Sequence, residues 1–400
     1  MRVSFLHCVA IRAPGFAALT RASVIALAAL LLLAASIRAA EPVAPANRYA
    51  VVGGGKLYYE ECGSGAAIDV VLLHDGLLHA VTWNEVWAPL CAKYHVLRYD
   101  RRGYGRSDAA SAPFAPEDDL FQLMRQTKME RAIIVGNSSG AGLALDFALA
   151  HPDMVEGLFL IGPVVHGMAS SAYFAERSAR ASAPMIKGDT KSTAENWARD
   201  PFLIAASHPQ ARRKFLDLLS QSPQNLIAGG SFETRPSPPT VLRLSQIGAP
   251  TLVVVGESDI ADVIAYGGAI EAALPIVFFE VWKDAGHLIQ LEQPAALVAR
   301  FDRFSRLADR REASVAPATL TAYVGTYRYN NRTIVITLNG GRLMLGLPDY
   351  PDKPLFAASS SRFFVRTTET EFEFQSDDAG KIRQLKIHNA DGATIDCPRA

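Results

Sequence analysis

Short apolar runs alternate with amphipathic segments through the middle of the chain. The runs predict buried strands at residues 69–73, 95–99, 132–135, 155–161, 251–255 and 276–282. Segments with helical spacing separate them, at residues 83–92, 117–126, 140–150, 261–273 and 294–307. Strands that are apolar throughout and alternate with helices predict a parallel sheet covered on both faces. The expected fold class is therefore α/β, with an edge hairpin at residues 48–62.

The strand pattern stops between residues 163 and 248. Helical segments replace it, at residues 172–181, 193–198 and 210–220. Structureless insertions of this length are uncommon. We therefore expect a helical cap here, inserted between two strands of one domain that spans residues 46–308.

Period-two alternation returns after an Ala/Ser/Pro-rich stretch that we interpret as a linker over residues 309–319. It predicts strands at residues 323–329, 333–338, 343–347, 362–367, 371–375 and 384–388. Turn signals such as Asn339-Gly340-Gly341 fall between the runs. Residues 320–400 are thus expected to form a separate, small antiparallel β domain.

The first 40 residues have the pattern of a secretory signal peptide. Arg2, Arg12 and Arg21 precede an apolar run at residues 24–35, and small residues follow it. The run is shorter than the roughly 20 apolar residues that span a bilayer. We expect cleavage and a secreted or periplasmic protein without a membrane span, and an uncleaved N-terminal anchor is the alternative.

Composition and charge narrow the possible partners. Of 400 residues, 49% are hydrophobic and 20% charged, as in a globular chain with a large core. The 40 basic and 40 acidic residues give zero formal net charge, so nucleic acid is not an expected partner. The four cysteines have no metal-ligand spacing, which argues against a zinc site and against a disulfide framework. Loss of Cys8 with the signal peptide would leave three cysteines, at least one of them unpaired or paired between chains.

Residues Gly136-Asn137-Ser138-Ser139-Gly140 fit the G-x-S-x-G pattern between a strand and a helix. A sharp strand-to-helix turn places its central residue in strained backbone angles and leaves little room for flanking side chains. Ser138 is the candidate nucleophile. The alternative is an ordinary glycine-rich loop.

A serine hydroxyl needs a base, and the base needs an orienting acid. Asp259 follows the strand at 251–255, and His287 follows the strand at 276–282, which gives the chain order Ser, Asp, His. His287 is the candidate base and Asp259 the candidate acid. The alternatives are a surface histidine and a helix N-cap, with Glu257 as the substitute acid.

A tetrahedral intermediate also needs two amide donors. We expect one from Ser139, the residue after the nucleophile, and one from the loop after the strand at 69–73, where Gly76 is the first choice and Leu77 the second. His74 is interpreted as structural, its ring bracing this loop. His79 faces either the pocket or solvent.

Together these segments and the stretch Asp100-Arg101-Arg102-Gly103-Tyr104-Gly105-Arg106-Ser107 resemble the α/β-hydrolase superfamily over residues 48–307. The resemblance implies an eight-stranded, mostly parallel sheet, a cap, no cofactor, and Ser138, Asp259 and His287 as nucleophile, acid and base. One position departs from the family, which usually has glycine where this chain has Asp75. A carboxylate there would oppose negative charge in the oxyanion hole, so we expect it to point away or to bind a cap residue.

The tail resembles the β domain often appended to secreted serine β-lactamase-like proteins. Two segments carry this resemblance, Tyr323-Val324-Gly325-Thr326-Tyr327 and Arg362-Phe363-Phe364. The S-x-x-K motif of β-lactamases themselves is absent from the sequence.

These observations predict a secreted serine hydrolase that cleaves carboxylic esters or related small acyl compounds, without metal or cofactor. The same triad serves lactone hydrolysis, carbon–carbon bond hydrolysis and cofactor-free perhydrolysis, and an idle serine would leave a binding protein. Substrate choice depends on the cap, where the candidate pocket residues are Met168, Tyr173, Phe174, Trp197 and Phe202. The sequence leaves the substrate, the role of the tail and the oligomeric state open.

Overall fold

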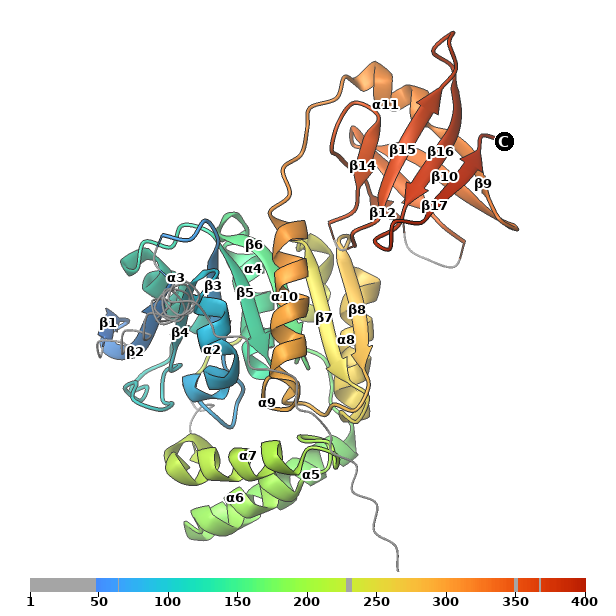
Figure 1. The fold of residues 1–400 in the computed structure, drawn as a ribbon. Coiled ribbons are helices and arrows are strands. Elements are labelled where there is room, and N and C mark those ends of the chain that lie inside the picture. The colour runs from blue at the N-terminus through green and yellow to red at the C-terminus, as the bar shows by residue number, and fades with distance from the viewer. Residues whose placement is uncertain (1–47, 64, 228–231, 349–351, 367) are drawn as a thin grey trace, which may run out of the picture. The chain divides into compact units, whose positions relative to one another are not determined.

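The computed structural model describes residues 48–63, 65–227, 232–348, 352–366 and 368–400 (Figure 1). The predicted signal peptide, residues 1–40, lies outside these residues. Among the described residues, no helix is long and apolar enough to cross a membrane.

An eight-stranded sheet forms the centre of the first domain, in the order β1-β2-β4-β3-β5-β6-β7-β8. Its strands are β1 Arg48–Val52, β2 Gly55–Cys62, β3 Asp69–Leu73, β4 His95–Tyr99, β5 Ala132–Asn137, β6 Val155–Ile161, β7 Thr251–Gly256 and β8 Val277–Trp282. β1 and β2 pair antiparallel at the edge, and all pairs from β4 onward are parallel. The predicted α/β class, the edge hairpin and the mostly parallel sheet are confirmed.

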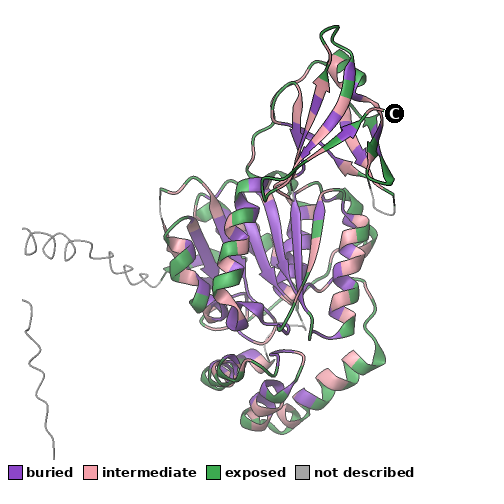
Figure 2. Cartoon of the chain, turned by 45° about the vertical axis from the view of Figure 1, so that its right-hand side comes forward, coloured by how far each residue is buried: buried purple, intermediate pink, exposed green. Residues whose placement is uncertain are grey.

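Helices cover both faces of this sheet (Figure 1). They are α2 Asn84–Cys91, α3 Pro116–Gln126, α4 Ser139–Ala150, α8 Ala261–Ala273, α9 Ile289–Glu292 and α10 Pro294–Ala308. Along β3, Val71 and Leu73 pack with α3, α4 and α8, whereas Val70 and Leu72 pack with α2 and α10. Full burial of each such side chain contributes about 1.5–3 kcal/mol, which explains why the central strands are apolar throughout. The buried residues follow the sheet in Figure 2.

Three helices between β6 and β7 form the cap: α5 Ala172–Ser182, α6 Thr190–Arg199 and α7 Pro209–Gln221. Ser171 and Asp189 accept hydrogen bonds from amides in the first turns of α5 and α6, which caps both helices. The cap has its own apolar cluster around Trp197 and Phe215, which also contains Leu78 and Leu288 from loops of the body. These contacts position the cap over the loops that follow the strands.

Short 3₁₀ turns complete this domain. They are η1 Ala80–Trp83, η2 Pro152–Met154, η3 Ala183–Lys187, η4 Pro223–Ile227, η5 Thr240–Leu242 and η6 Leu244–Gln246.

The tail has a four-stranded sheet in the order β12-β11-β10-β9 and a five-stranded sheet in the order β13-β14-β15-β16-β17, both antiparallel. The strands are β9 Gly325–Tyr329, β10 Arg332–Asn339, β11 Arg342–Gly346, β12 Lys353–Pro354, β13 Phe356–Ala357, β14 Arg362–Phe364, β15 Glu371–Ser376, β16 Ile382–His388 and β17 Thr394–Pro398. Alternating residues such as Phe372 and Phe374 of β15 enter one shared core.

Two local predictions in the tail are wrong. Helix α11, Pro317–Tyr323, occupies the end of the predicted linker and the first residue of the predicted strand. Proline at the first position favours a helix start, and its lost amide costs nothing there. The sequence pattern also missed β12 and β13, because two-residue strands are too short to show alternation, and it missed the five-residue β17.

Cys62 at the end of β2 and Cys91 at the end of α2 form a disulfide, with Cα atoms 5.4 Å apart. The cysteine spacing argued against a disulfide framework, and the structure nevertheless joins this one pair. Twenty-nine positions separate the two residues, so no local spacing marked them. Cys397 is a buried free thiol, and Cys8 lies outside the described residues.

Candidate active site

Ser138 occupies the turn between β5 and α4, with φ 57° and ψ −121°. This region of backbone space is strained for a residue with a side chain. The turn closes because Gly136 and Gly140 lack side chains. A Cβ at Gly136 would lie 2.5 Å from the Gly140 carbonyl oxygen, and one at Gly140 would lie 2.3 Å from the Leu73 carbonyl oxygen. The pattern G-x-S-x-G thus has the sharp-turn geometry expected for it.

Gly140 has a second effect, because it lets the N-terminus of α4 approach the backbone that follows β3. The amides of Gly76, in the loop after β3, and of Ser139, the first residue of α4, belong to these two segments. The close approach brings both segments to one end of the sheet.

His287 and Asp259 come together from the loops after β8 and β7. His287 Nδ1 lies 2.8 Å from Asp259 Oδ2. A carboxylate only accepts hydrogen bonds, so Nδ1 carries the proton and Nε2 is free to act as a base. The two loops are joined by a hydrogen bond from the Ser258 amide to the Ala285 carbonyl, 2.9 Å long. Asn137 Nδ2 donates to the His287 carbonyl at 3.1 Å and so ties the histidine loop to the end of β5.

Burial disfavours the charged imidazole of His287, but the adjacent Asp259 carboxylate outweighs burial and raises the pKa of His287 above its usual value. Asp259 also accepts a hydrogen bond from the Ile260 amide at 2.7 Å, so its two oxygens serve different partners. Glu257, the alternative acid, is exposed. The structure therefore pairs His287 with Asp259 rather than with Glu257.

Ser138, Asp259 and His287 line one cavity of about 160 Å³. Asp75, Gly76 and Leu77 line it from the loop after β3, and Val164, Ile260, Val263 and Leu288 complete the side that belongs to the body. The cap contributes Phe174, Arg177, Ser178, Trp197 and Leu203. A hydroxyl, an imidazole with a free nitrogen and a carboxylate in one small cavity are the groups needed for nucleophilic acyl transfer.

The Asp75 carboxylate is bonded within its own loop. Asp75 is buried, with 2% exposure, and lines the cavity, and no cap residue within the described ranges bonds to its carboxylate. Its Oδ1 accepts hydrogen bonds from the amides of Leu77 and Leu78, at 2.7 and 2.8 Å. The predicted bond to a cap residue is not formed, because the carboxylate stabilises its own loop instead. These bonds also occupy the Leu77 amide, which leaves Gly76 as the stronger candidate for an oxyanion donor.

His74 braces the same loop. Its Nε2 accepts a hydrogen bond from the Arg101 amide at 2.9 Å, and its Nδ1 donates to the Asp75 carbonyl at 2.7 Å. Complete burial lowers the pKa of His74 well below its usual value, so the ring is neutral. His79 is also buried, bonded to Asn225 at 3.0 Å, and is not among the residues that line the cavity.

The cap contributes a positively charged side chain to the cavity, and the sequence analysis did not identify this residue. Arg177 of α5 lines it, with Nε 2.6 Å from Asp200 Oδ2. The rings of Phe174, Trp197 and Phe202 surround the guanidinium at 5.5–5.8 Å. Of the five aromatic and methionine candidates, only Phe174 and Trp197 line the cavity, while Met168, Tyr173 and Phe202 do not. Helical spacing alone does not reveal which face of α5 turns inward.

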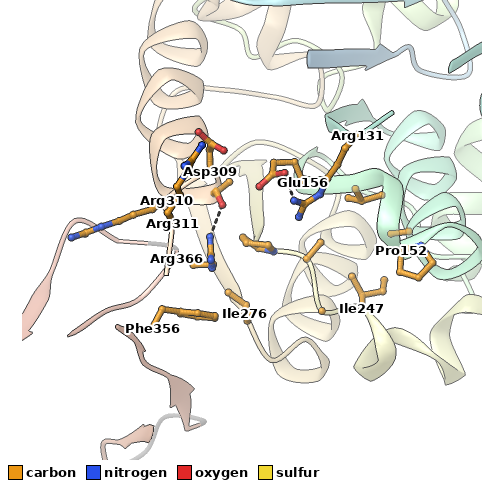
Figure 3. Close-up of a pocket in the computed structure, with 16 residues that line it drawn as sticks. Arg131, Pro152, Glu156, Ile247, Ile276, Asp309, Arg310, Arg311, Phe356 and Arg366 are labelled. Carbon is orange, nitrogen blue, oxygen red and sulfur yellow. Dashed lines mark hydrogen bonds and ion pairs between the residues drawn. The ribbon is translucent and has the colours of Figure 1, made fainter. Parts of the chain in front are cut away.

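A larger cavity of about 490 Å³ lies elsewhere (Figure 3). Its charged lining residues are Arg131, Glu156, Asp309, Arg310, Arg311 and Arg366. Arg131 is paired with Glu156 at 2.7 Å, and Arg366 donates to the Ala308 carbonyl at 2.7 Å. Among the described residues that line it there is no serine, cysteine or histidine, so the smaller cavity is the better candidate for an active site.

Within the described ranges, no group of three or more His, Cys, Asp or Glu residues forms a metal site.

Comparison with known proteins agrees with this geometry. Residues 69–294 match the family model of the alpha/beta hydrolase fold. The chain belongs to the α/β-hydrolase family. The tail, residues 309–397, matches a domain of unknown function, DUF3471.

Several relatives within this family are enzymes. The chain is 26% identical over 277 residues to 2-hydroxy-6-oxo-6-phenylhexa-2,4-dienoate hydrolase of Comamonas testosteroni, covering 63% of this chain and 89% of that one. A thermophilic esterase from Thermogutta terrifontis has a similar fold, with TM-score 0.55, 24% identity, and coverage of 68% of this chain and 100% of that chain. An enol-lactonase from Burkholderia xenovorans gives TM-score 0.54, 24% identity, and coverage of 64% and 98%. Such relatives support a hydrolase, and they differ among themselves in the bond that is cleaved.

Proposed function

We propose that this protein is an exported serine hydrolase that cleaves carboxylic esters or related acyl compounds through an acyl-enzyme. The observation that carries the proposal is the shared cavity of Ser138, in its strained turn, and His287, whose Nδ1 is held by Asp259. His287 Nε2 takes the proton of Ser138, and Ser138 Oγ attacks the substrate carbonyl.

The amides of Gly76 and Ser139 are the proposed oxyanion donors. The Ser139 amide opens α4, so the helix dipole adds to its attraction for negative charge. The carbonyl reforms as the alcohol leaves with the proton from His287. Water then attacks the acyl-enzyme with His287 as base, and Ser138 is regenerated as the acid departs.

Replacement of the nucleophile tests the proposal most directly. Ser138→Ala should lower turnover of an ester substrate by several orders of magnitude while the protein stays folded. A fluorophosphonate probe should label the wild type and leave Ser138→Ala unlabelled. Wild-type turnover by the folded variant would contradict the mechanism, and a wild type that the probe does not label would favour a binding protein with an idle serine.

Lactone and carbon–carbon bond hydrolysis remain the alternative reactions, because relatives with both kinds of name share the fold and the same triad serves each. A panel of esters, lactones and vinylogous diketones, measured with the wild type and with Ser138→Ala, distinguishes these reactions. The substrate class that the wild type turns over and Ser138→Ala does not identifies the bond that is cleaved.

Export is part of the proposal. The basic and apolar pattern of residues 1–40 supports it, and so does the Cys62–Cys91 disulfide, since such bonds persist in oxidising compartments. Expression of the full chain in a bacterial host should yield a processed protein in the periplasmic fraction. Recovery of the uncleaved chain in the membrane fraction would support the anchor instead.

We propose an accessory, stabilising role for the tail, whose interior is filled by its own side chains.

A further inference from the structure

The loop after β4, residues 100–107, takes no direct part in the proposed acyl transfer. It contains two neighbouring arginines, Arg101 and Arg102, each with 7% exposure. Arg102 is paired with the Asp119 carboxylate at 2.8 Å, whereas no ion pair joins Arg101 to an acidic side chain within the described residues. A buried cation without a counter-charge is costly. Pairing with a carboxylate therefore explains Arg102 but not Arg101.

The Arg101 guanidinium contacts both segments that carry the proposed oxyanion donors. Its Nη2 donates to the backbone carbonyl of Asp75 at 3.0 Å and to Ser139 Oγ at 2.9 Å. The two segments are also close to each other, since a Cβ at Gly76 would lie 3.3 Å from Ser139 Oγ. One nitrogen atom therefore joins the loop after β3 to the first residue of α4.

The bond to the Asp75 carbonyl sets the direction of the Gly76 amide. This carbonyl and the Gly76 N–H belong to one planar peptide group, which is trans, so they point in opposite directions. His74 Nδ1 donates to the same carbonyl at 2.7 Å, so two donors hold it. The Gly76 N–H consequently points away from Arg101, and Gly76 lines the cavity that contains Ser138.

The two proposed donor amides have no other acceptor in the part of the chain that the structure describes. Neither the Gly76 N–H nor the Ser139 N–H donates a hydrogen bond there. Hydrogen bonds accepted by a peptide carbonyl polarise the N–H of the same peptide group and make it a stronger donor. The positive charge of Arg101 adds to this effect, because it favours negative charge near the two amides.

We propose that Arg101 is a positioning residue of the oxyanion hole, whose guanidinium holds the Gly76 peptide and Ser139 so that both amides point to one substrate oxygen. This inference rests on the proposed function. The effect belongs to the transition state, because negative charge develops on that oxygen only as the tetrahedral intermediate forms. Substitution of Arg101 should therefore lower kcat and kcat/KM together and leave KM nearly constant.

Thionoesters test this role, because sulfur accepts hydrogen bonds more weakly than oxygen. The two substrates are a p-nitrophenyl ester that the wild type cleaves and its thionoester, in which sulfur replaces the carbonyl oxygen. Each kcat/KM is divided by the rate constant of hydroxide-catalysed hydrolysis, which removes the difference in intrinsic reactivity. The wild type should favour the oxygen ester. In Arg101→Met, kcat on that ester should fall by about 10- to 100-fold and the corrected preference by about tenfold.

Arg102→Met is the matched control, because Arg102 is the neighbour of Arg101 in the chain and is equally buried. Its guanidinium donates to Asp119 and to the Val52 carbonyl instead of the oxyanion segments. The substitution should destabilise the fold, since it leaves the Asp119 carboxylate buried without its partner. The corrected preference for oxygen should stay within about twofold of the wild type.

An equal preference in the wild type and Arg101→Met would overturn the proposal, and so would an equal fall in both arginine variants. Fluorophosphonate labelling of Ser138 keeps this result separate from the proposed function. An enzyme that labels and cleaves the ester, with a preference that Arg101→Met leaves unchanged, refutes only the role of Arg101.

A second variant decides the question if Arg101→Met does not fold. Ser139→Ala removes the hydroxyl that Arg101 Nη2 binds but keeps the Ser139 amide. The corrected preference should then fall by about threefold or more, the effect of one hydrogen bond. An unchanged preference in Ser139→Ala would overturn the proposal.

Discussion

The floor and the roof of the small cavity are held by different kinds of interaction. The floor consists of the lining residues of the body, which come from α8 and from the loops after β3, β5, β6, β7 and β8, and the roof consists of the cap residues that line the cavity. In the floor, backbone strain at Ser138 and hydrogen bonds of 2.8 and 3.1 Å at His287 hold the catalytic candidates in place. In the roof, Arg177 is held by aromatic rings and one carboxylate. The difference suggests that changes in the floor alter the chemistry, whereas changes in the roof alter which substrate is accepted.

After loss of the nucleophile, the largest effect should come from removing the charge of Asp259. In Asp259→Asn the amide no longer fixes the proton on His287 Nδ1, and turnover should fall by about 10⁴-fold, as for other triads of this kind. The steady-state kcat on an ester substrate gives the loss. Glu257→Gln is the matched control and should remain within about twofold, in the range of exposed substitutions. A large loss in the control instead would identify Glu257 as the acid.

The glycine beside the nucleophile should be the next most sensitive position. In Gly140→Ala the added Cβ meets the Leu73 carbonyl oxygen at 2.3 Å, and only a backbone shift relieves the clash. We expect turnover to fall about 10²-fold, the cost of misplacing a reacting group by roughly 1 Å. The free energy of unfolding should fall by about 1–3 kcal/mol.

Gly268 of α8 provides the control for that substitution, because a Cβ there meets no atom within 4 Å. Gly268→Ala should keep full activity and gain about 0.5–1 kcal/mol of stability. Equal behaviour of the two alanine variants in kinetic and denaturation measurements would mean that the tight turn at Ser138 is not required.

Substitutions in the roof should change the kinetic constants less than substitutions in the floor. Arg177→Met keeps most of the apolar stem but removes the guanidinium, so we expect KM to change by up to about tenfold with kcat nearly constant. Arg180→Met, one turn further along α5 and exposed, should behave as the wild type. A loss confined to kcat would show that Arg177 takes part in the chemistry, and the division between floor and roof would not hold.

The smallest effect concerns pH. His287 must be neutral to act as a base, and the Asp259 carboxylate raises its pKa above 6.5 despite burial. Activity should therefore rise with pH, and kcat/KM at pH 6.5 should be less than half of its plateau value. Arg177 lowers the pKa of His287, so the half-maximal pH should move upward in Arg177→Met. A half-maximal pH below 6.5 in the wild type would contradict this assignment.

The sequence could predict the floor of the cavity but little of its roof. Ser138, Asp259 and His287 each follow an apolar strand, and parallel strands end at the same edge of a sheet, so their convergence follows from the chain order. The position of Arg177 depends instead on how the cap helices pack. The two bonds within the Asp75 loop depend on local backbone angles, which a single sequence does not specify. The pairing of Cys62 with Cys91 likewise needs the distance between β2 and α2.

Cys397 offers a built-in probe of one domain. Its side chain is completely buried in β17, and the other cysteines within the described residues are joined to each other. Removal of the first 40 residues would make it the single reactive thiol of the mature chain. The rate at which a thiol reagent modifies the native protein would then measure opening of the β-rich tail alone, independently of events in the catalytic body.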